Sequence, residues 1–295
     1  MKPEIIDIHP HIISTDTERY PIAPQHGHRS NWSAKRPVTF EQLSAEMDEA
    51  GVAKAAIVHS STTYGHNNAY VADCVAQQPG RFTGVYSFDL LAADALKTFD
   101  YWLAHGMGGI RLFTGGATHQ GDGSWLVNPA TFPVWERCAE IGMTMAVQTT
   151  PAGLSMVAEL AQRFPGVSIV LDHCARPVIE DGPPYEACAA LFALSAFDNV
   201  YMKITPRTFD LAQAAPGGAE PFFARLVEVF GADHLAFGSN YPASAGPLKT
   251  LVDQGHACFA GLSDEARRWI WGGTALRLYP MLAESTPQRI SAAAR

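Results

Sequence analysis

The segment TFEQLSAEMDEAGVAKAAIVHS, residues 39–60, joins a helical pattern to a strand pattern. Thr39 is suited to cap the start of a helix, and Gly51 is suited to end it in the left-handed conformation that glycine adopts without strain. Residues 54–60 follow as a short apolar run, which predicts a buried strand. The segment EIIDIHPH, residues 4–11, precedes the helix and predicts an earlier strand. The chain is therefore expected to begin with a β–α–β unit.

The same alternation continues along the chain and predicts eight strands with helices between them. The remaining strands are expected at residues 82–89, 107–114, 143–150, 168–174, 199–205 and 234–240, and the remaining helices at 68–80, 93–106, 129–142, 154–166, 185–197, 221–231 and 247–259. Strict alternation indicates parallel strands with right-handed crossovers, and eight units in under 300 residues fit a (β/α)8 TIM barrel. A doubly wound sheet is the competing topology, but the GxGxxG turn typical of it is absent. We predict one barrel domain over residues 1–284 and a polar C-terminal tail over 285–295.

Composition narrows the class of protein. Apolar residues make up 47% of the chain and charged residues 17%, which favours a globular protein with a large core. The net charge is −8 and no basic cluster occurs, so nucleic acid and anionic membranes are poor partners. The five cysteines are scattered without a CxxC motif, which favours reduced thiols and a cytoplasmic location. No apolar run has the length of a membrane span.

Polar residues at the predicted strand ends form the candidate site, because the C-terminal ends of barrel strands converge on one face. One strand histidine is more often structural, but His9 and His11, joined by His173 at another strand end, favour a functional cluster. Arg111 cannot lie unpaired in a dry core, so it is expected to face the barrel mouth and bind a carboxylate. The long loop over residues 14–38 follows the first strand and should cover this mouth. The candidate substrate-binding residues are Arg111, Arg176, Lys203, Tyr64, Asn68 and Gln148, and the candidate catalytic residues are His9, His11, His173 and Asn240.

Several motifs resemble one known family. The segments DIHPH (7–11), VLDHCARP (170–177), FGSNYP (237–242) and GGTALRLYP (272–280) are similar to those of the amidohydrolase superfamily. The nearer likeness is to the amidohydrolase-2 type, which includes 2-pyrone-4,6-dicarboxylate lactonase and related hydrolases and decarboxylases, and it covers about residues 5–281. The resemblance implies a distorted (β/α)8 barrel and a hydrolase that opens a lactone or similar cyclic ester of a small carboxylated compound, as in aromatic-compound catabolism.

The resemblance does not decide whether the site holds a metal ion. Metal-dependent members surround a divalent ion with the first-strand histidine pair, histidines on strands five and six, and an aspartate on strand eight that activates water. This chain has Gln148 and Asn240 at two of these positions. Zinc or manganese held by His9, His11 and His173 remains one expectation, and metal-free operation remains the other.

Asn240 has no titratable oxygen and cannot serve as a general base. A metal-bound hydroxide or neutral His173 would then activate the water. One alternative function is a metal-dependent decarboxylase or hydratase of an aromatic or unsaturated acid. A second is a barrel that binds a small carboxylated molecule without turnover. A homo-oligomer is compatible with the sequence, which contains no pattern that decides the oligomeric state.

Overall fold

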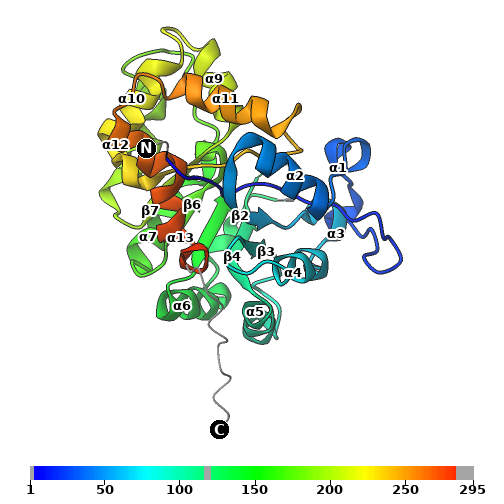
Figure 1. Ribbon diagram of the computed structural model, residues 1–295. Helices are drawn as coiled ribbons and strands as arrows, with labels where there is room; N and C mark the ends of the chain where they lie inside the picture. Colours follow the sequence, from blue (N-terminus) through cyan, green and yellow to red (C-terminus); the bar gives the residue numbers. More distant parts are fainter. Residues whose placement is uncertain (1–2, 116–120, 284–295) are drawn as a thin grey trace.

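The computed structural model describes residues 3–115 and 121–283, which form a ring of parallel strands with helices outside it (Figure 1). Neighbouring strands follow the order of the sequence from β1 to β8, and each of the pairs from β1–β2 to β7–β8 is parallel. This confirms the predicted (β/α)8 barrel. The strands are β1 Ile5–Asp7, β2 Val52–Val58, β3 Phe82–Tyr86, β4 Met107–Phe113, β5 Thr144–Gln148, β6 Ile169–Leu171, β7 Val200–Ile204 and β8 Leu235–Phe237.

The ring closes between β8 and β1 by a mixture of backbone and side-chain bonds. The backbone N–H of Ile8 donates to the carbonyl of Phe237 at 3.1 Å. Just beyond both strands, Asp7 Oδ1 accepts from the backbone N–H of Ser239 at 2.8 Å and from that of His9 at 2.9 Å. A buried carboxylate thus continues the contact where the short strands end, which agrees with the expected distortion of the barrel.

Most of the helices predicted from the alternating pattern are present in the structure. Thr39 and Gln42 form a reciprocal capping box at the start of α2, and Gly51 ends that helix at φ 72°. In Figure 1, α2 lies beside α11, so the first and last crossover helices complete the outer layer. The helices are α1 Asn31–Lys35, α2 Phe40–Ala50, α3 Ser61–Tyr64, α4 Ala69–Val75, α5 Ala95–Ala104, α6 Phe132–Ile141, α7 Leu154–Arg163, α8 Ala189–Phe192, α9 Pro206–Ala214, α10 Ala219–Phe230, α11 Leu248–Cys258, α12 Asp264–Arg268 and α13 Thr274–Leu278.

The structure differs from the helical predictions in several places. The helix expected over 185–197 is only α8, flanked by 3-10 turns. The segments α1, α3, α9, α12 and α13 were not expected from the alternation, because they are additions to the eight repeated units. The predicted tail over 285–295 lies outside the described residues.

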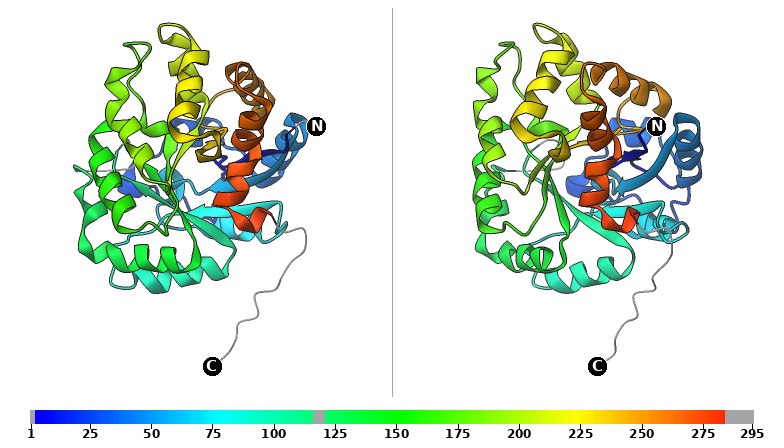
Figure 2. Two further views of the ribbon diagram at one scale, coloured as in Figure 1. Left: turned by 90° about the vertical axis from the view of Figure 1, so that its left-hand side faces the viewer. Right: turned by 60° about the vertical axis from the view of Figure 1, so that its left-hand side comes forward.

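Two apolar cores stabilise the barrel. The larger lies between the strands and the outer helices. The smaller fills the barrel interior with side chains such as Ile6, Val58 and Val170, and Leu278 and Tyr279 at the end of α13 pack against it. Figure 2 shows this C-terminal segment, orange to red, running beside the start of the chain. The end of α13 therefore covers one end of the barrel interior. The polar residues at the C-terminal ends of the strands are left to form a site.

All five cysteines are free and buried, as expected for reduced thiols. Among residues 3–115 and 121–283, no helix has both the length and the apolar character needed to cross a membrane.

Candidate active site

Three histidine rings meet at the strand ends. The ring centroid of His9 lies 5.0 Å from that of His11 and 5.0 Å from that of His173. The sequence pattern placed His9 and His11 on a strand, but β1 ends at Asp7, so both follow the strand in irregular backbone. The predicted cluster is therefore present, although strand alternation does not produce it.

His173 and Arg176 are presented by an unusual turn. Residues 173–176 all have positive φ, between 50° and 57°, and the N–H of Arg176 donates to the carbonyl of His173 at 3.0 Å. This is a single left-handed turn built without glycine, and each such residue costs about 1–2 kcal/mol. Strain of this kind is found where a site requires a fixed geometry, and here both side chains line the same pocket.

Asp172 connects three cationic or imidazole side chains below the pocket. Its Oδ1 lies 2.7 Å from Lys203 Nζ and 3.5 Å from His9 Nδ1, and its Oδ2 accepts from Arg111 Nε at 2.8 Å. Arg111 also donates to Gln148 Oε1 at 3.0 Å. Asp172, Lys203 and His9 are fully buried. The network therefore holds the Arg111 guanidinium in one place from behind.

The same charges determine which groups are ionised. Burial would raise the pKa of Asp172, but Lys203 and Arg111 outweigh burial and hold that pKa well below its ordinary value. Burial, assisted by Lys203, lowers the pKa of His9 well below its usual range, and burial does the same to His173. Burial lowers the pKa of His11 to about 3. All three imidazoles are therefore neutral near pH 7, and His9 lies beside the ionised carboxylate of Asp172.

The hydrogen bonds fix the tautomer of one histidine. His11 Nδ1 lies 2.7 Å from the carbonyl oxygen of Val58, which can only accept, so Nδ1 carries the proton. His11 Nε2 consequently has a free lone pair. His173 Nδ1 lies 2.8 Å from Thr205 Oγ1, a hydroxyl that can donate or accept. His11 can therefore take a proton from the pocket side in its neutral state.

His11, His173 and Arg111 line one wall of a cavity of about 200 Å³, which we call the cationic pocket. Its lining contains three guanidinium groups, from Arg111, Arg176 and Arg207, and among the described residues no Asp or Glu lines it. Arg176 and Arg207 form no ion pair with described residues, and both are exposed. The complete lining is His11, Ser30, Trp32, Ser60, Ser61, Thr62, Arg111, Phe113, Gln148, His173, Arg176, Arg207, Asn240 and Ala243.

Of the predicted site residues, some lie in the pocket and others lie behind it. His11, His173, Asn240, Arg111, Arg176 and Gln148 line it, whereas His9, Lys203, Tyr64 and Asn68 do not. The hydroxyl of Tyr64 accepts from the N–H of Ser14 at 2.7 Å. The amide of Asn68 bridges loops by bonding both backbone groups of Ser87. In this structure these four residues support the pocket, and their direct contact with substrate stays a prediction.

Trp32 and Arg207 are two of the eight lining residues that were not among the predicted site residues. Trp32 stacks on His11 with ring centroids 5.1 Å apart, and it comes from the long loop after β1 that was expected to cover the mouth. Arg207 begins α9, a helix that the alternation did not predict. The sequence signal for Arg207 is its position shortly after Lys203, at the end of a predicted strand. Asn240 lies at φ 53°, and its Nδ2 donates to Ser244 Oγ at 3.0 Å, which leaves the side-chain oxygen for the pocket.

The residues present do not fit a metal ion well. Among the described residues no group of three or more His, Cys, Asp or Glu side chains is arranged to hold one. The nitrogens of His9 are buried without a hydrogen bond, as a ligand's would be, but Lys203 and Arg111 bring positive charge to the same centre. Gln148 and Asn240 supply no charged ligand. The positive charge at this centre therefore favours a bound anion over a metal cation.

The family is shown by comparison with known proteins. A family model described as Amidohydrolase matches residues 6–281, so this chain belongs to the amidohydrolase family. The resemblance found in the sequence motifs is thereby confirmed over nearly the same residues.

One curated relative is similar over part of its length. An L-fucono-1,5-lactonase from Burkholderia ambifaria is 27% identical over 170 residues, 54% of this chain and 57% of the relative. The match thus spans little more than half the length of that curated relative.

Solved structures that are similar share the fold. A protein from Pseudomonas putida described as a candidate 2-pyrone-4,6-dicarboxylic acid hydrolase has a TM-score of 0.75 at 22% identity, covering 96% of this chain and 100% of that chain. An amidohydrolase from Burkholderia multivorans with bound zinc has a TM-score of 0.74 at 20% identity, covering 94% and 99%. A 5-carboxyvanillate decarboxylase from Sphingomonas paucimobilis has a TM-score of 0.65 at 14% identity, covering 95% and 99%.

Proposed function

We propose that this protein is a hydrolase that opens a lactone of a small carboxylated compound, in the catabolism of aromatic compounds. The observation that carries the proposal is the cationic pocket, where Arg111, Arg176 and Arg207 face neutral histidines in a protein whose net charge is −8. A concave site of one sign concentrates ligands of the opposite sign even when the whole protein repels them. The lactonase among the similar proteins supports a lactone as the substrate, and the pyrone hydrolase supports a carboxylated one.

The chemistry follows from the protonation states. His11 Nε2 accepts a hydrogen bond from a water molecule and directs the water oxygen to the lactone carbonyl carbon. Because burial lowers the pKa of His11 to about 3, the imidazole does not keep the water proton but relays it. The ester C–O bond of the ring breaks, and the proton passes to the departing ring oxygen. The Asn240 side-chain oxygen orients the water, while Arg176 and Arg207 hold the substrate carboxylate. Arg111, positioned by Asp172 and Gln148, places its guanidinium against the charge that develops on the carbonyl oxygen.

Two supporting assignments remain part of this proposal. His9 lies behind the pocket beside Asp172, and its ring packs against the rings of His11 and His173 and holds them in position. His173 takes the role of base in place of His11 if the hydroxyl of Thr205 accepts from its Nδ1. A zinc or manganese ion on His9, His11 and His173 is not used in this mechanism, since the charges around His9 disfavour it. The cytoplasm is the proposed location.

The proposal is tested with 2-pyrone-4,6-dicarboxylate, L-fucono-1,5-lactone and 5-carboxyvanillate, each before and after treatment with a strong chelator. We expect hydrolysis of the carboxylated lactone, retained after chelation. Arg207→Met should raise KM for that lactone about tenfold, the value of one partly exposed charge-assisted hydrogen bond, and should leave the uncharged lactone unaffected. Arg225→Met is the matched control, because Arg225 is paired with Glu228 on α10, away from the pocket.

Other outcomes would overturn the proposal. Release of carbon dioxide from 5-carboxyvanillate with loss of activity on chelation would establish the decarboxylase alternative. Tight binding of the dicarboxylate without turnover would establish the non-catalytic barrel.

A further inference from the structure

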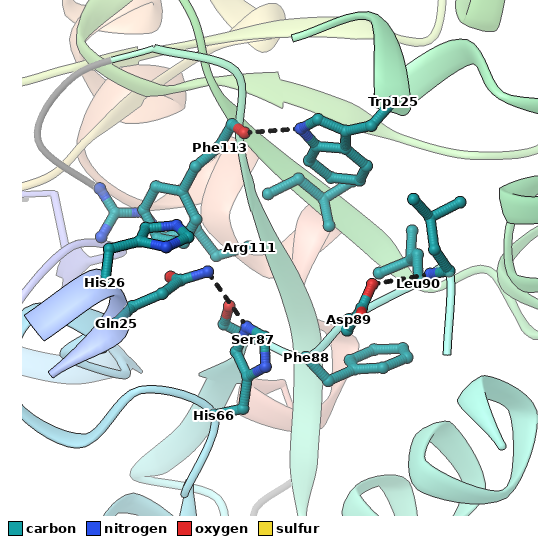
Figure 3. A pocket seen from close by; sticks show the side chains of 12 residues that line it. Gln25, His26, His66, Ser87, Phe88, Asp89, Leu90, Arg111, Phe113 and Trp125 are labelled. Atoms are coloured by element: carbon teal, nitrogen blue, oxygen red, sulfur yellow. Dashed lines mark hydrogen bonds between the residues drawn. The ribbon is translucent and has the colours of Figure 1, made fainter. Parts of the chain in front are cut away.

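A second cavity adjoins the cationic pocket and is larger, about 360 Å³. Arg111 and Phe113 line both cavities, so the two meet at these side chains. Figure 3 shows side chains that line the second cavity, with Gln25 and His26 on one side and Trp125, Leu90 and Asp89 on the other. None of the chemistry proposed above uses it.

The lining of this second cavity differs in character from that of the cationic pocket. We call this second cavity the apolar chamber, after its wall of apolar side chains, which are Phe88, Leu90, Leu91, Leu112, Phe113 and Trp125. Trp125 is held in place, since its Nε1 donates to the carbonyl of Phe113 at 3.2 Å. The remaining lining residues are Gln25, His26, His66, Ser87, Asp89 and Arg111. Apart from Arg111 at the junction, the only charged side chain among these described residues is the exposed carboxylate of Asp89.

Charge therefore separates the two cavities. The guanidinium groups of Arg176 and Arg207 line the cationic pocket and not the chamber, whereas Asp89 lines the chamber and not the pocket. A carboxylate is attracted to the first cavity and repelled from the second. An apolar group gains free energy from leaving water in the chamber, where aromatic and aliphatic side chains surround it.

We infer that the substrate carries an uncharged apolar or aromatic substituent, which enters the apolar chamber while its carboxylate and lactone ring occupy the cationic pocket. This inference rests on the proposed function for the identity of the reacting ring. It narrows the substrate class from lactones of small carboxylated compounds in general to amphipathic lactones that are larger than a single ring. The cationic pocket alone, at about 200 Å³, is smaller than the range of about 300–1,000 Å³ usual for ligand sites.

Binding of simple carboxylates tests the chamber without requiring turnover. The probes are acetate, benzoate and 3-phenylpropionate, and the readout is calorimetric titration of the full-length protein. We expect 3-phenylpropionate to bind at least tenfold more tightly than acetate, because a phenyl ring removes enough apolar area from water to give that gain. Equal affinity for the three probes, or no binding by any of them, would overturn the inference.

A pair of variants with matched exposure locates the gain. Leu91 is 42% exposed at the rim of the chamber, and Leu96 is 44% exposed on α5 and lines neither cavity. Leu91→Asn should abolish most of the advantage of 3-phenylpropionate and leave the affinity for acetate unchanged, because it removes apolar surface without adding charge. Leu96→Asn should change neither. Equal loss in both variants, or loss of acetate binding with Leu91→Asn alone, would contradict the assignment.

Failure of the proposed function is seen separately, as the absence of lactone turnover. If the binding advantage is present and no lactone is hydrolysed, the chamber stands and the reaction assignment falls. If carboxylated lactones are hydrolysed equally well with and without a phenyl substituent, the reaction stands and the chamber is not a substrate site.

Discussion

Lys203 is the residue whose removal most directly tests the network below the site. Its ammonium lies 2.7 Å from Asp172, with both side chains fully buried. At an effective dielectric constant of about 20, unit charges at that separation attract by about 6 kcal/mol. Desolvation of both ions offsets much of this attraction, and removing one partner of a buried pair typically costs about 3–5 kcal/mol. Because Arg111 still neutralises Asp172, we expect Lys203→Met to cost about 3 kcal/mol.

Urea unfolding followed by far-ultraviolet circular dichroism measures this cost, since the midpoint falls when the denaturant slope is unchanged. The double variant Lys203→Met with Asp172→Asn also removes the carboxylate that pairs with Arg111, so it should regain little of the loss. Lys249→Met removes an exposed ion pair with Asp253 and should change stability by less than about 0.5 kcal/mol. A loss below about 1 kcal/mol for Lys203→Met would refute the view that this ion pair stabilises the barrel.

Three further variants test other features. Ala175→Gly should stabilise the protein by roughly 0.5–1 kcal/mol in urea unfolding, because glycine adopts the left-handed turn without strain; a loss would contradict the strain argument. Burial lowers the pKa of His59 to about 4, so the unfolded chain binds the proton first and stability falls as the pH drops from about 6.5 towards 4. His59→Gln, which keeps a donor for the carbonyl of Gly65, should lessen that fall, as thermal unfolding between pH 4 and 7 would show; an unchanged slope would exclude His59 as its source. Asn240→Asp places a carboxylate among the pocket arginines and should raise the rate of lactone hydrolysis at least tenfold in steady-state assays, and a lower rate would show that the amide is the better group.

Local pattern was sufficient for the fold and for part of the site. The alternation of strand and helix patterns predicts a parallel barrel because each unit buries one strand between helices, whatever the details of the loops. Thr39 and Gly51 mark the limits of α2 by local hydrogen bonds and backbone preference, which the chain carries in a few neighbouring residues. His11, His173, Arg111 and Asn240 were predicted at strand ends, and the structure brings them to one pocket.

Only the tertiary structure distinguishes residues that face the pocket from residues that support it. Lys203 and Arg111 both follow from strand-end positions, but burial beside Asp172 draws the lysine below the pocket and leaves the arginine at its wall. The left-handed turn at His173 and the contact of Trp32 with His11 depend on long-range packing, which no local pattern encodes. The sequence by itself determined the barrel and the residue types at its mouth, because these depend on periodicity and strand direction. The division into a cationic pocket and an apolar chamber was decided by how loops distant in the chain meet at Arg111 and Phe113.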